Sequence, residues 1–288
     1  MKRLFLLSAA LGLAAPVARA EITLTGDARM GVLSDQFALE TAFTSRARLA
    51  FTLTAETDSG LFFGATFRAD QADDAASGNG GEVWVLGDFG RLSMGDVDGA
   101  AHAAVGQVSG AGLTGLRNLH EVDYHADASG GAGPSVLYEY SVGAFSGYLS
   151  LTNPAGGTVH RSAGVKYATD TLTFAAGYET EPDFGMEHLV LGASGRLGSM
   201  TAKAVFSQVR DLWGATDYDV LALSLDYSAD ALTVTGFYRR LDAGFGGHGA
   251  QGVGASYDLG NGASLVGGYA KQDGLSRATW DLGLSFSF

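Results

Sequence analysis

Hydrophobic and polar residues alternate with a period of two along most of this chain. Near the C-terminal end one face carries only large apolar residues, which are Trp280, Leu282, Leu284, Phe286 and Phe288. The residues between them are Asp281, Gly283, Ser285 and Ser287. Residues 22–33 and 43–55 repeat this alternation. Because successive side chains of a β-strand point to opposite faces, the pattern predicts strands, and no comparably long segment has the spacing of an amphipathic helix.

Sixteen segments of the sequence read as strands of this kind. In chain order they are 22–33, 43–56, 61–70, 82–87, 91–95, 135–142, 145–152, 161–169, 171–180, 187–195, 200–208, 218–227, 232–241, 250–258, 263–270 and 278–288. Tight turns such as 57–60 and 259–262 alternate with longer polar connections. Those connections are 71–81, 153–160, 209–217 and 242–249. An even number of strands lets the last strand pair with the first, so that no sheet edge stays open.

The two faces of the strands distinguish a membrane barrel from a soluble β-protein. One face is Leu, Val, Phe, Ala and Tyr on nearly every strand, and the other is Thr, Ser, Gly, Asp and Arg. A membrane barrel has this apolar exterior and a polar lumen. Aromatic residues fall near strand ends, where membrane interfaces favour them; they are Tyr138, Tyr140, Tyr167, Tyr178, Tyr227, Tyr257, Tyr269 and Trp280. We therefore expect an all-β fold, a 16-stranded antiparallel transmembrane β-barrel.

The first twenty residues have the pattern of a cleaved signal peptide. Lys2 and Arg3 precede an apolar run that ends at a small-x-small site, Ala18-Arg19-Ala20. We expect the barrel to occupy residues 21–288, and loss of three basic residues takes the formal net charge from −13 to −16. This acidic balance argues against nucleic-acid binding. The absence of Cys excludes disulfides and Cys-ligated metals.

The start of the predicted barrel, residues 21–32 (EITLTGDARMGV), resembles the first strand of the general-diffusion porins of purple and related alphaproteobacteria. Residues 57–65, residues 252–260 and the terminal Phe288 are similar to the same family, in the same order. The resemblance covers essentially the whole chain. It implies a channel in the outer membrane of a Gram-negative bacterium, for passive diffusion of ions and small hydrophilic solutes. It also implies a homotrimer, contact with outer-membrane lipid and lipopolysaccharide, and recognition of Phe288 by the barrel-assembly machinery.

One connection, residues 96–134, is far longer than a hairpin needs. By the resemblance it takes the place of the third loop, which folds into a porin barrel and narrows it, and we call it the constriction loop. Four of its carboxylates are assigned to the acidic side of the constriction: Asp96, Asp98, Glu121 and Asp123. Inward positions of the first three strands carry the basic wall, which is Arg29, Arg46, Arg48 and Arg68.

An acidic loop opposite a basic wall predicts a transverse electric field across the narrowest water. The acidic net charge favours a weak preference for cations. Pairing the second and third strands through turn 57–60 places Arg48 beside Asp70. The alternative is that some arginines only form salt bridges inside the barrel, with Asp27, Asp70 or Glu56.

Other chemistries receive less support from the sequence. Gly110 to Gly115 matches the phosphate-binding pattern GxGxxG, but no strand precedes it. The six histidines lack metal-ligand spacing and are interpreted as solvated loop residues. No cofactor is expected, although a calcium ion between the loop carboxylates stays an alternative.

Three alternative functions share the barrel fold. A substrate-selective channel would need a ladder of aromatic residues along the lumen, and only Phe62 and Phe237 are assigned inward positions. A non-conducting structural barrel would fill its lumen with bulky side chains, whereas the inward positions here are mostly Thr, Ser and Gly. An outer-membrane hydrolase would need an ordered Ser/His/Asp group, which the sequence does not offer. We therefore expect a channel and not an enzyme.

Overall fold

The computed structural model describes residues 20–37, 40–71, 80–128, 133–183, 185–211, 217–244 and 246–288. The predicted signal peptide, residues 1–20, lies outside these ranges except for Ala20. Most of the predicted connection 71–81 and part of 209–217 also lie outside them. None of the described helices is long and apolar enough to cross a membrane.

Sixteen strands make up almost all of the described regular structure. They are β1 (Glu21–Ser34), β2 (Thr41–Glu56), β3 (Phe62–Asp70), β4 (Glu82–Gly87), β5 (Gly90–Gly95), β6 (Ser135–Val142), β7 (Phe145–Leu151), β8 (Arg161–Ala168), β9 (Leu172–Glu181), β10 (Met186–Leu197), β11 (Met200–Arg210), β12 (Tyr218–Ala229), β13 (Leu232–Ala243), β14 (Gly246–Gly260), β15 (Ala263–Gln272) and β16 (Thr279–Ser287). The predicted number and order of strands are confirmed.

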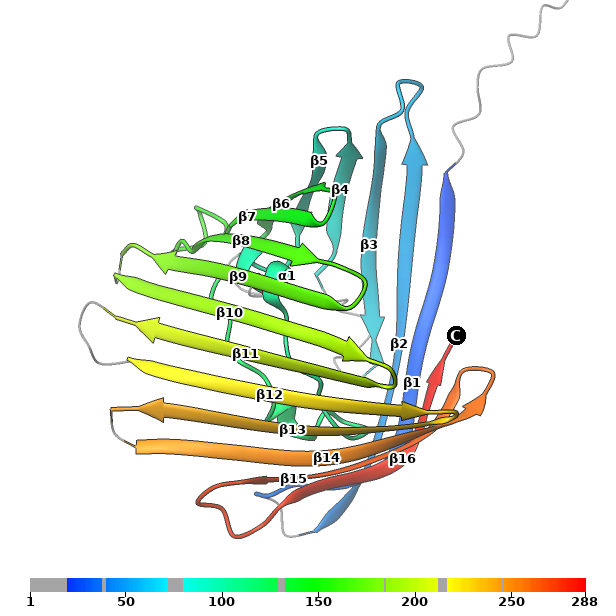
Figure 1. Cartoon of the computed structure of the whole chain (residues 1–288). Coiled ribbons are helices and arrows are strands. Elements are labelled where there is room, and N and C mark those ends of the chain that lie inside the picture. Colours follow the sequence, from blue (N-terminus) through cyan, green and yellow to red (C-terminus); the bar gives the residue numbers. More distant parts are fainter. Residues whose placement is uncertain are drawn as a thin grey trace, which may run out of the picture.

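The sheet closes on itself as a barrel. Every strand pairs antiparallel with its neighbours in the sequence, and β1 also pairs with β16, where Met30 lies opposite Leu284 (Figure 1). Closure leaves no sheet edge without a hydrogen-bonding partner, which is the condition for a sheet in hydrocarbon. The predicted apolar face is the outer face, because Ile22, Leu24 and Phe43 are 69%, 57% and 94% exposed.

Short turns join the strands at one end of the barrel, as predicted. Asp230 and Asn261 take left-handed conformations there, with φ of 49° and 51°, which Asp and Asn adopt more readily than most residues. One predicted loop was too long. Residues 246–249 of the predicted connection 242–249 belong to β14 and pair with Arg240 to Ala243 of β13. Backbone hydrogen bonds extend this ladder through a Gly-rich segment that has no β-pattern of its own.

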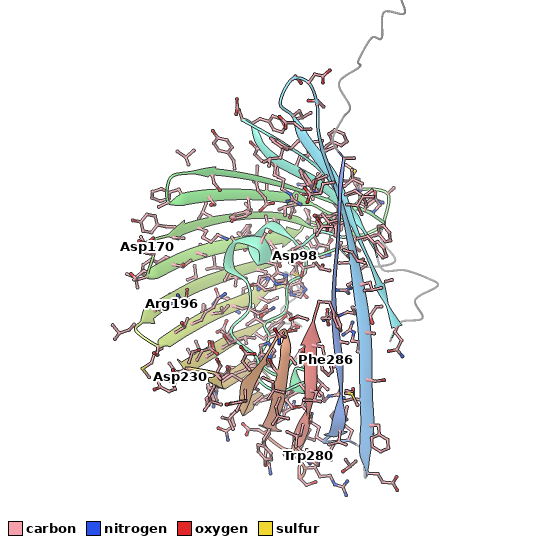
Figure 2. The ribbon with its side chains drawn as sticks, turned by 90° about the vertical axis from the view of Figure 1, so that its right-hand side faces the viewer. Asp98, Asp170, Arg196, Asp230, Trp280 and Phe286 are labelled. Carbon is pink, nitrogen blue, oxygen red and sulfur yellow. The ribbon has the colours of Figure 1, made fainter. Side chains whose placement is uncertain are left out.

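The constriction loop runs inside the barrel along the wall and then returns. It contains the helix α1 (Ala100–Val105) and the 3-10 helix η2 (Leu116–Asn118), and Figures 1 and 2 show α1 within the ring of strands. The outgoing and returning arms are tied together, because the Gln107 side-chain amide both donates to the Val122 carbonyl and accepts from the Val122 N–H, at 2.7 and 2.8 Å. The predicted placement of this loop within the lumen is confirmed.

Helix α1 packs directly on a row of glycines in the wall. A Cβ added to Gly177 on β9 would lie 2.5 Å from the Cβ of Ala101, and one added to Gly192 on β10 would lie 2.7 Å from Val105. Gly164 on β8 meets Ala100 as closely. Only glycine lets a helix backbone approach the sheet to this distance.

Wall side chains satisfy both ends of this helix. The Ala100 and Ala101 N–H groups each donate to a serine hydroxyl at 2.8 Å, that of Ser150 and that of Ser162. At the other end, the Lys203 ammonium donates to the Val105 carbonyl at 2.7 Å. These contacts occupy two of the orphan donors and one of the orphan acceptors of the helix, and they place a cation at its negative end.

A second docking point holds the tip of the loop. Gly112 lies over Gly268 of β15, where an added Cβ would meet its Cα at 2.6 Å. The Asp281 carboxylate on β16 accepts the N–H groups of Leu113 and Thr114 at 2.9 and 2.7 Å, and also the Thr114 hydroxyl at 2.6 Å. The GxGxxG pattern therefore serves close packing of the loop on the barrel wall.

Three consecutive residues of the tip, Leu116, Arg117 and Asn118, have left-handed backbone conformations with φ of 48°, 63° and 55°. Such residues are strained unless the surroundings hold them. Here Leu116 is fully buried, and Arg117 donates to Asp35, in the segment after β1, at 2.7 Å.

The apolar core of the molecule lies between the constriction loop and the wall. Val97, Val105, Val108 and Val122 of the loop pack against inward residues of β6, β7 and β10–β12, which include Val190, Val205, Val220 and Ala222. These strands therefore carry apolar residues at the inward positions that the loop covers, as well as at the outward positions that face lipid.

We expect Gly177→Val to push α1 off the wall. The new side chain overlaps Ala101, and overpacking of this kind costs about 1–3 kcal/mol. The helix can move only toward the lumen, so single-channel conductance should fall and the urea midpoint should drop. Gly147→Val is the control, because no atom lies within 4 Å of a Cβ added there. Equal conductance of G177V and the unchanged protein would contradict the packing role of Gly177.

We expect Asp281→Asn to loosen the loop tip. The substitution removes the charge that three donors share, and hydrogen bonds to charged groups contribute about 1.5–3 kcal/mol each. Local opening should then expose Arg117 to trypsin about tenfold more often. Asp258→Asn is the control, since its carboxylate accepts the Gly260 N–H in a distant turn. Equal cleavage rates in D281N and D258N would show that Asp281 does not hold the tip.

Candidate functional site

Two short motifs of the constriction loop present carboxylates to the lumen. In Asp96-Val97-Asp98 and Glu121-Val122-Asp123 the valine is buried against the wall, at 5% and 2% exposure. The flanking carboxylates point the other way, and those of Asp98, Glu121 and Asp123 are 62%, 38% and 64% exposed. Burial of each valine therefore turns its acidic neighbours toward water.

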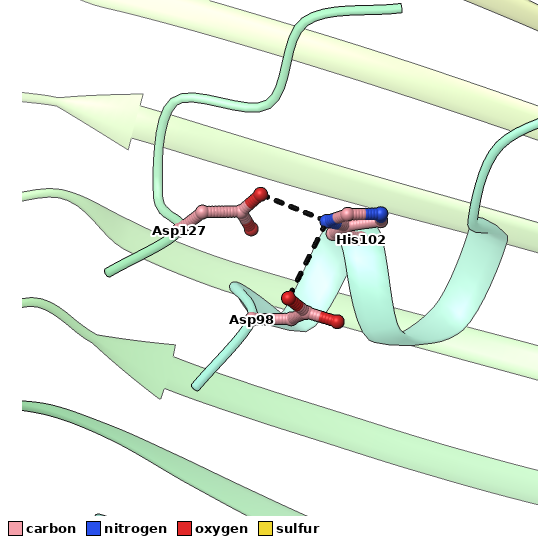
Figure 3. Close-up of side chains that lie close together, drawn as sticks. All are labelled: Asp98, His102 and Asp127. Carbon is pink, nitrogen blue, oxygen red and sulfur yellow. Dashed lines mark hydrogen bonds and ion pairs between the residues drawn. The ribbon is translucent and has the colours of Figure 1, made fainter. Parts of the chain in front are cut away.

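His102 on α1 lies at the centre of the acidic side. Its Nδ1 is 2.8 Å from Asp127 Oδ2 and 3.7 Å from Asp98 Oδ1. Figure 3 marks both contacts with dashed lines. The imidazole stacks on Tyr124, with ring centroids 4.2 Å apart. Asp98, His102 and Asp127 offer three donor atoms within 4.8 Å of one another, which is a spacing that a divalent cation could bridge.

The protein environment changes the protonation of these groups. Desolvation raises the pKa of Asp98, and the neighbouring charges of Asp127 and Asp96 raise it further, against the opposite effect of His102. Desolvation likewise raises the pKa of Glu121, assisted by the charge of Asp123. Desolvation lowers the pKa of His102, but the hydrogen bond and charge of Asp127 outweigh it, so the net shift is upward. All three shifts favour the protonated form.

The basic wall lies on β1, β2 and β3, as the alternation predicts. Arg29 and Arg46 are cross-strand neighbours, an arrangement of like charges that is unfavourable without partners. Arg29 donates to the Leu113 carbonyl of the loop tip at 3.3 Å. Arg68 on β3 is exposed to the lumen and forms no ion pair with any residue in the described ranges.

Two of the four arginines are engaged in salt bridges within the barrel. Arg48 lies opposite Asp70 in the strand register, as predicted, but its guanidinium pairs with Asp27 of β1 at 2.8 Å. Asp70 pairs instead with Arg46, whose Nε lies 2.9 Å from Asp70 Oδ2. The alternative considered from the sequence was that some arginines form salt bridges inside the barrel. It applies to Arg46, which pairs with Asp70, and to Arg48, which pairs with Asp27.

Side chains on both sides of the predicted constriction are exposed to solvent. Asp27 and Arg48 on the wall side keep 48% and 28% of their side chains exposed, although both point into the barrel. Asp98 and Asp123 on the loop side also remain exposed. The loop carboxylates and the pair Asp27–Arg48 are thus both accessible to solvent on the inner side of the barrel.

Several lumen charges were not assigned from the sequence. Arg239 on β13 lies 3.8 Å from Asp123, so that carboxylate has a cationic neighbour on a different wall. The sequence did contain a signal for this charge. Arg239 and Arg240 are consecutive residues of a predicted strand, so the period of two must place one of their side chains in the lumen. Arg91 on β5 pairs with Glu82 at 2.6 Å and lies over the inward ring of Trp84.

The interpretation of the six histidines as solvated loop residues is wrong for His120, which is only 8% exposed, and for His188. His188 lies on β10 and is fully buried, with Nδ1 2.7 Å from Glu179 Oε2 and Nε2 2.7 Å from Ser207 Oγ. The Glu179 carboxylate also accepts the His125 N–H of the returning loop arm at 2.8 Å. A buried acid and imidazole thus hold the loop, and the inward position of His188 in an apolar strand was the available signal.

Residues 7–275 match the family described as Gram-negative porin. A porin of Rhodobacter capsulatus is 35% identical over 303 aligned positions, which cover 93% of this chain and the whole relative. A porin of Fuscovulum blasticum is 26% identical with the same coverage. Among solved structures, a porin refined at 1.8 Å resolution has a TM-score of 0.83 and 34% identity, covering 93% of this chain and all of that chain.

These similarities extend over the whole barrel, from β1 to the last strands, and include the constriction loop. They confirm the family, the closed barrel and the outer-membrane location that the sequence predicts. The chain belongs to the Gram-negative porins, and it is a channel of the outer membrane that lets ions and small hydrophilic solutes diffuse passively, rather than an enzyme.

Proposed function

We propose that this porin has a weak preference for cations, set by the carboxylates of the constriction loop. The observation that carries the proposal is the paired exposure of Asp96-Val97-Asp98 and Glu121-Val122-Asp123 toward the lumen. Arg46 and Arg48 on the facing wall are offset by Asp70 and Asp27. Arg29 and Arg68 keep their charge without a carboxylate partner in the described ranges, and Arg239 offsets Asp123. We expect the four loop carboxylates to outweigh these remaining cations in the field that a passing ion meets.

The field across the constriction would also orient dipolar solutes. Charges on opposite sides of a narrow aqueous space favour solutes that can align a dipole, and they disfavour apolar solutes that displace hydration water. A substrate-selective channel receives less support. Phe237 is 5% exposed beneath the loop, with its ring 5.7 Å from that of His120, so it offers no stacking surface to a solute.

A homotrimer forms part of the proposal. On β1 to β7, the outward positions in the described ranges carry no charged side chain, whereas β8, β10–β13 and β15 carry outward charges near the long-loop end. The charge-free outer face supports contact between subunits on that side. We also propose a signal peptide cleaved after Ala20, assembly through the barrel-assembly machinery with Phe288 as its address, and lipopolysaccharide as a neighbour of the outer surface.

Passive diffusion requires no cofactor, and we propose none. The alternative kept from the sequence is a calcium ion between loop carboxylates, and Asp98 and Asp127 offer oxygen atoms within 4.8 Å of each other. The hydrogen-bond contact between His102 and Asp127 at 2.8 Å satisfies both groups without an ion. This contact favours the arrangement without calcium.

We expect the triple variant Asp96→Asn, Glu121→Gln, Asp123→Asn to lose most of the cation preference. The substitutions remove three negative charges from the loop face while they keep side-chain size. The reversal potential of planar bilayers under a KCl gradient measures the effect and should move toward zero or to the anion side.

A matched control removes three carboxylates outside the lumen. Asp58, Asp170 and Asp230 lie in short turns, and Figure 2 labels two of them at the rim, away from α1. The variant D58N/D170N/D230N should keep the reversal potential. If the loop variant also keeps it, the loop carboxylates do not set the selectivity.

Cation preference should fall as the solution is acidified. His102, with its pKa above the ordinary value of 6.5, gains a positive charge first, and Asp98 and Glu121 become neutral at a higher pH than ordinary carboxyls. Both changes reduce the negative charge of the loop, so the reversal potential should shift between about pH 7 and pH 4. His102→Gln should remove the upper part of the shift. A constant reversal potential over this range would contradict the assignment.

A further inference from the structure

A groove of about 630 Å³ crosses the outer wall over β12 to β15. Its floor is Gly236 of β13, where an added Cβ would meet only the Gly252 carbonyl oxygen, at 3.9 Å. The strand register places Leu225, Gly236 and Val253 side by side in one row. A glycine between two aliphatic neighbours thus leaves a slot in a surface that faces hydrocarbon.

The slot is apolar at its floor and polar at one end. The next row toward the long-loop end consists of Tyr238, Gln251 and Lys271, which the register places side by side on β13, β14 and β15. Two residues of strand separate the rows, or about 7 Å. A molecule lying along the slot would therefore meet carbon at the floor and donors at the rim.

Lys271 is a cation without a carboxylate partner. Among the outward charges of β8 to β15, Arg210 pairs with Asp219 at 2.9 Å and Arg240 pairs with Asp242 at 2.8 Å. Lys271 is exposed and forms no ion pair with any residue that the structure describes. Asp273, the next outward residue, accepts the Gly249 N–H.

We infer that this groove binds a phosphate-bearing lipid of the outer leaflet, with an acyl chain over Gly236 and the phosphate at Lys271, Tyr238 and Gln251. The inference rests on the proposed function, because only a barrel in that membrane meets such a lipid with its long-loop end. Ammonium, hydroxyl and amide groups all donate to phosphate oxygen. Tyr269 lies opposite Trp280 on the neighbouring strand, and such aromatic residues mark the membrane interface. Lys271 is the next outward residue of β15 toward the long-loop end, so its ammonium group lies at the level of the lipid headgroups.

A second outer groove lacks this chemistry. It measures about 670 Å³, lies over β6 to β10 around Gly147, and has no charged residue in its lining. It can receive hydrocarbon and has tyrosine hydroxyls, but it offers no cation to a phosphate, and part of it lies on the charge-free face proposed for subunit contact. The groove at Gly236 differs by its cation, which selects an anionic lipid over a second copy of the barrel.

Native mass spectrometry of the protein purified from membranes, with added diphosphoryl lipid A, tests the inference. Lys271→Ala should lower lipid retention about fivefold, the effect of one basic side chain at an anionic lipid surface. Gly236→Leu should fill the slot and lower retention at any salt concentration, whereas the loss in K271A should shrink as salt rises.

Two matched variants serve as controls. Arg161→Ala removes another outward cation near the long-loop end, and Gly147→Leu fills the other groove. Both should retain lipid A normally. Equal losses in K271A and R161A, or in G236L and G147L, would overturn the inference. So would displacement of lipid A by millimolar inorganic phosphate, which would indicate a free-anion site, or a shift of the oligomer mass in G236L, which would indicate a subunit contact.

Conductance separates this inference from the proposed function. Lys271 and Gly236 face away from the lumen, so both variants should insert into bilayers with unchanged step size and reversal potential. Normal channels with unchanged lipid retention would overturn the lipid site alone. Absence of channels from the unchanged, folded protein would overturn the proposed function as well.

Discussion

The requirement that every backbone N–H and C=O be paired inside a membrane determines this structure. Hydrocarbon offers no hydrogen bonds, so a sheet can cross it only when its first and last strands meet, as β1 and β16 do. Closure then divides all strand residues into two sets, one facing lipid and one facing the lumen. The lumen set has to accommodate both water and the constriction loop.

The loop can lie in the lumen because the wall supplies what its backbone needs. Glycines at 164, 177 and 192 let α1 approach the sheet, and hydroxyl and ammonium groups of the wall bind its polar ends. Asp281 and Glu179 hold the tip and the returning arm through main-chain N–H groups. Position is thus fixed by contacts to backbone atoms, which leaves the side chains of Asp98 and Asp123 available to the water that solutes cross.

The barrel was predictable from the sequence because one face of each strand meets lipid and the other meets the lumen. Apolar and polar residues therefore alternate with a period of two, as at Ile22, Leu24 and their counterparts on later strands. The position of the loop in the barrel came from its length and the resemblance. The docking sites of the loop on the wall could not be predicted in this way, because they depend on which inward glycines face which loop residues. Val190, Val205 and Val220 carried a signal, since an apolar residue on the lumen face needs a protein cover. Gly246 to Gly249 carried none, because backbone pairing with β13, and not a side-chain pattern, makes this segment a strand.

The ion pairs of the constriction show why charges are harder to predict than faces. Register placed Arg48 beside Asp70, and it does lie there, yet the guanidinium reaches Asp27 while Arg46 takes Asp70. Long side chains select diagonal as well as direct partners, and the choice depends on all neighbours at once. An ion pair keeps a dipole but little net charge. The field inside the barrel therefore depends less on how many charges line the lumen than on which of them lack a partner, and among the described residues Arg68 lacks one whereas Asp123 has Arg239 beside it.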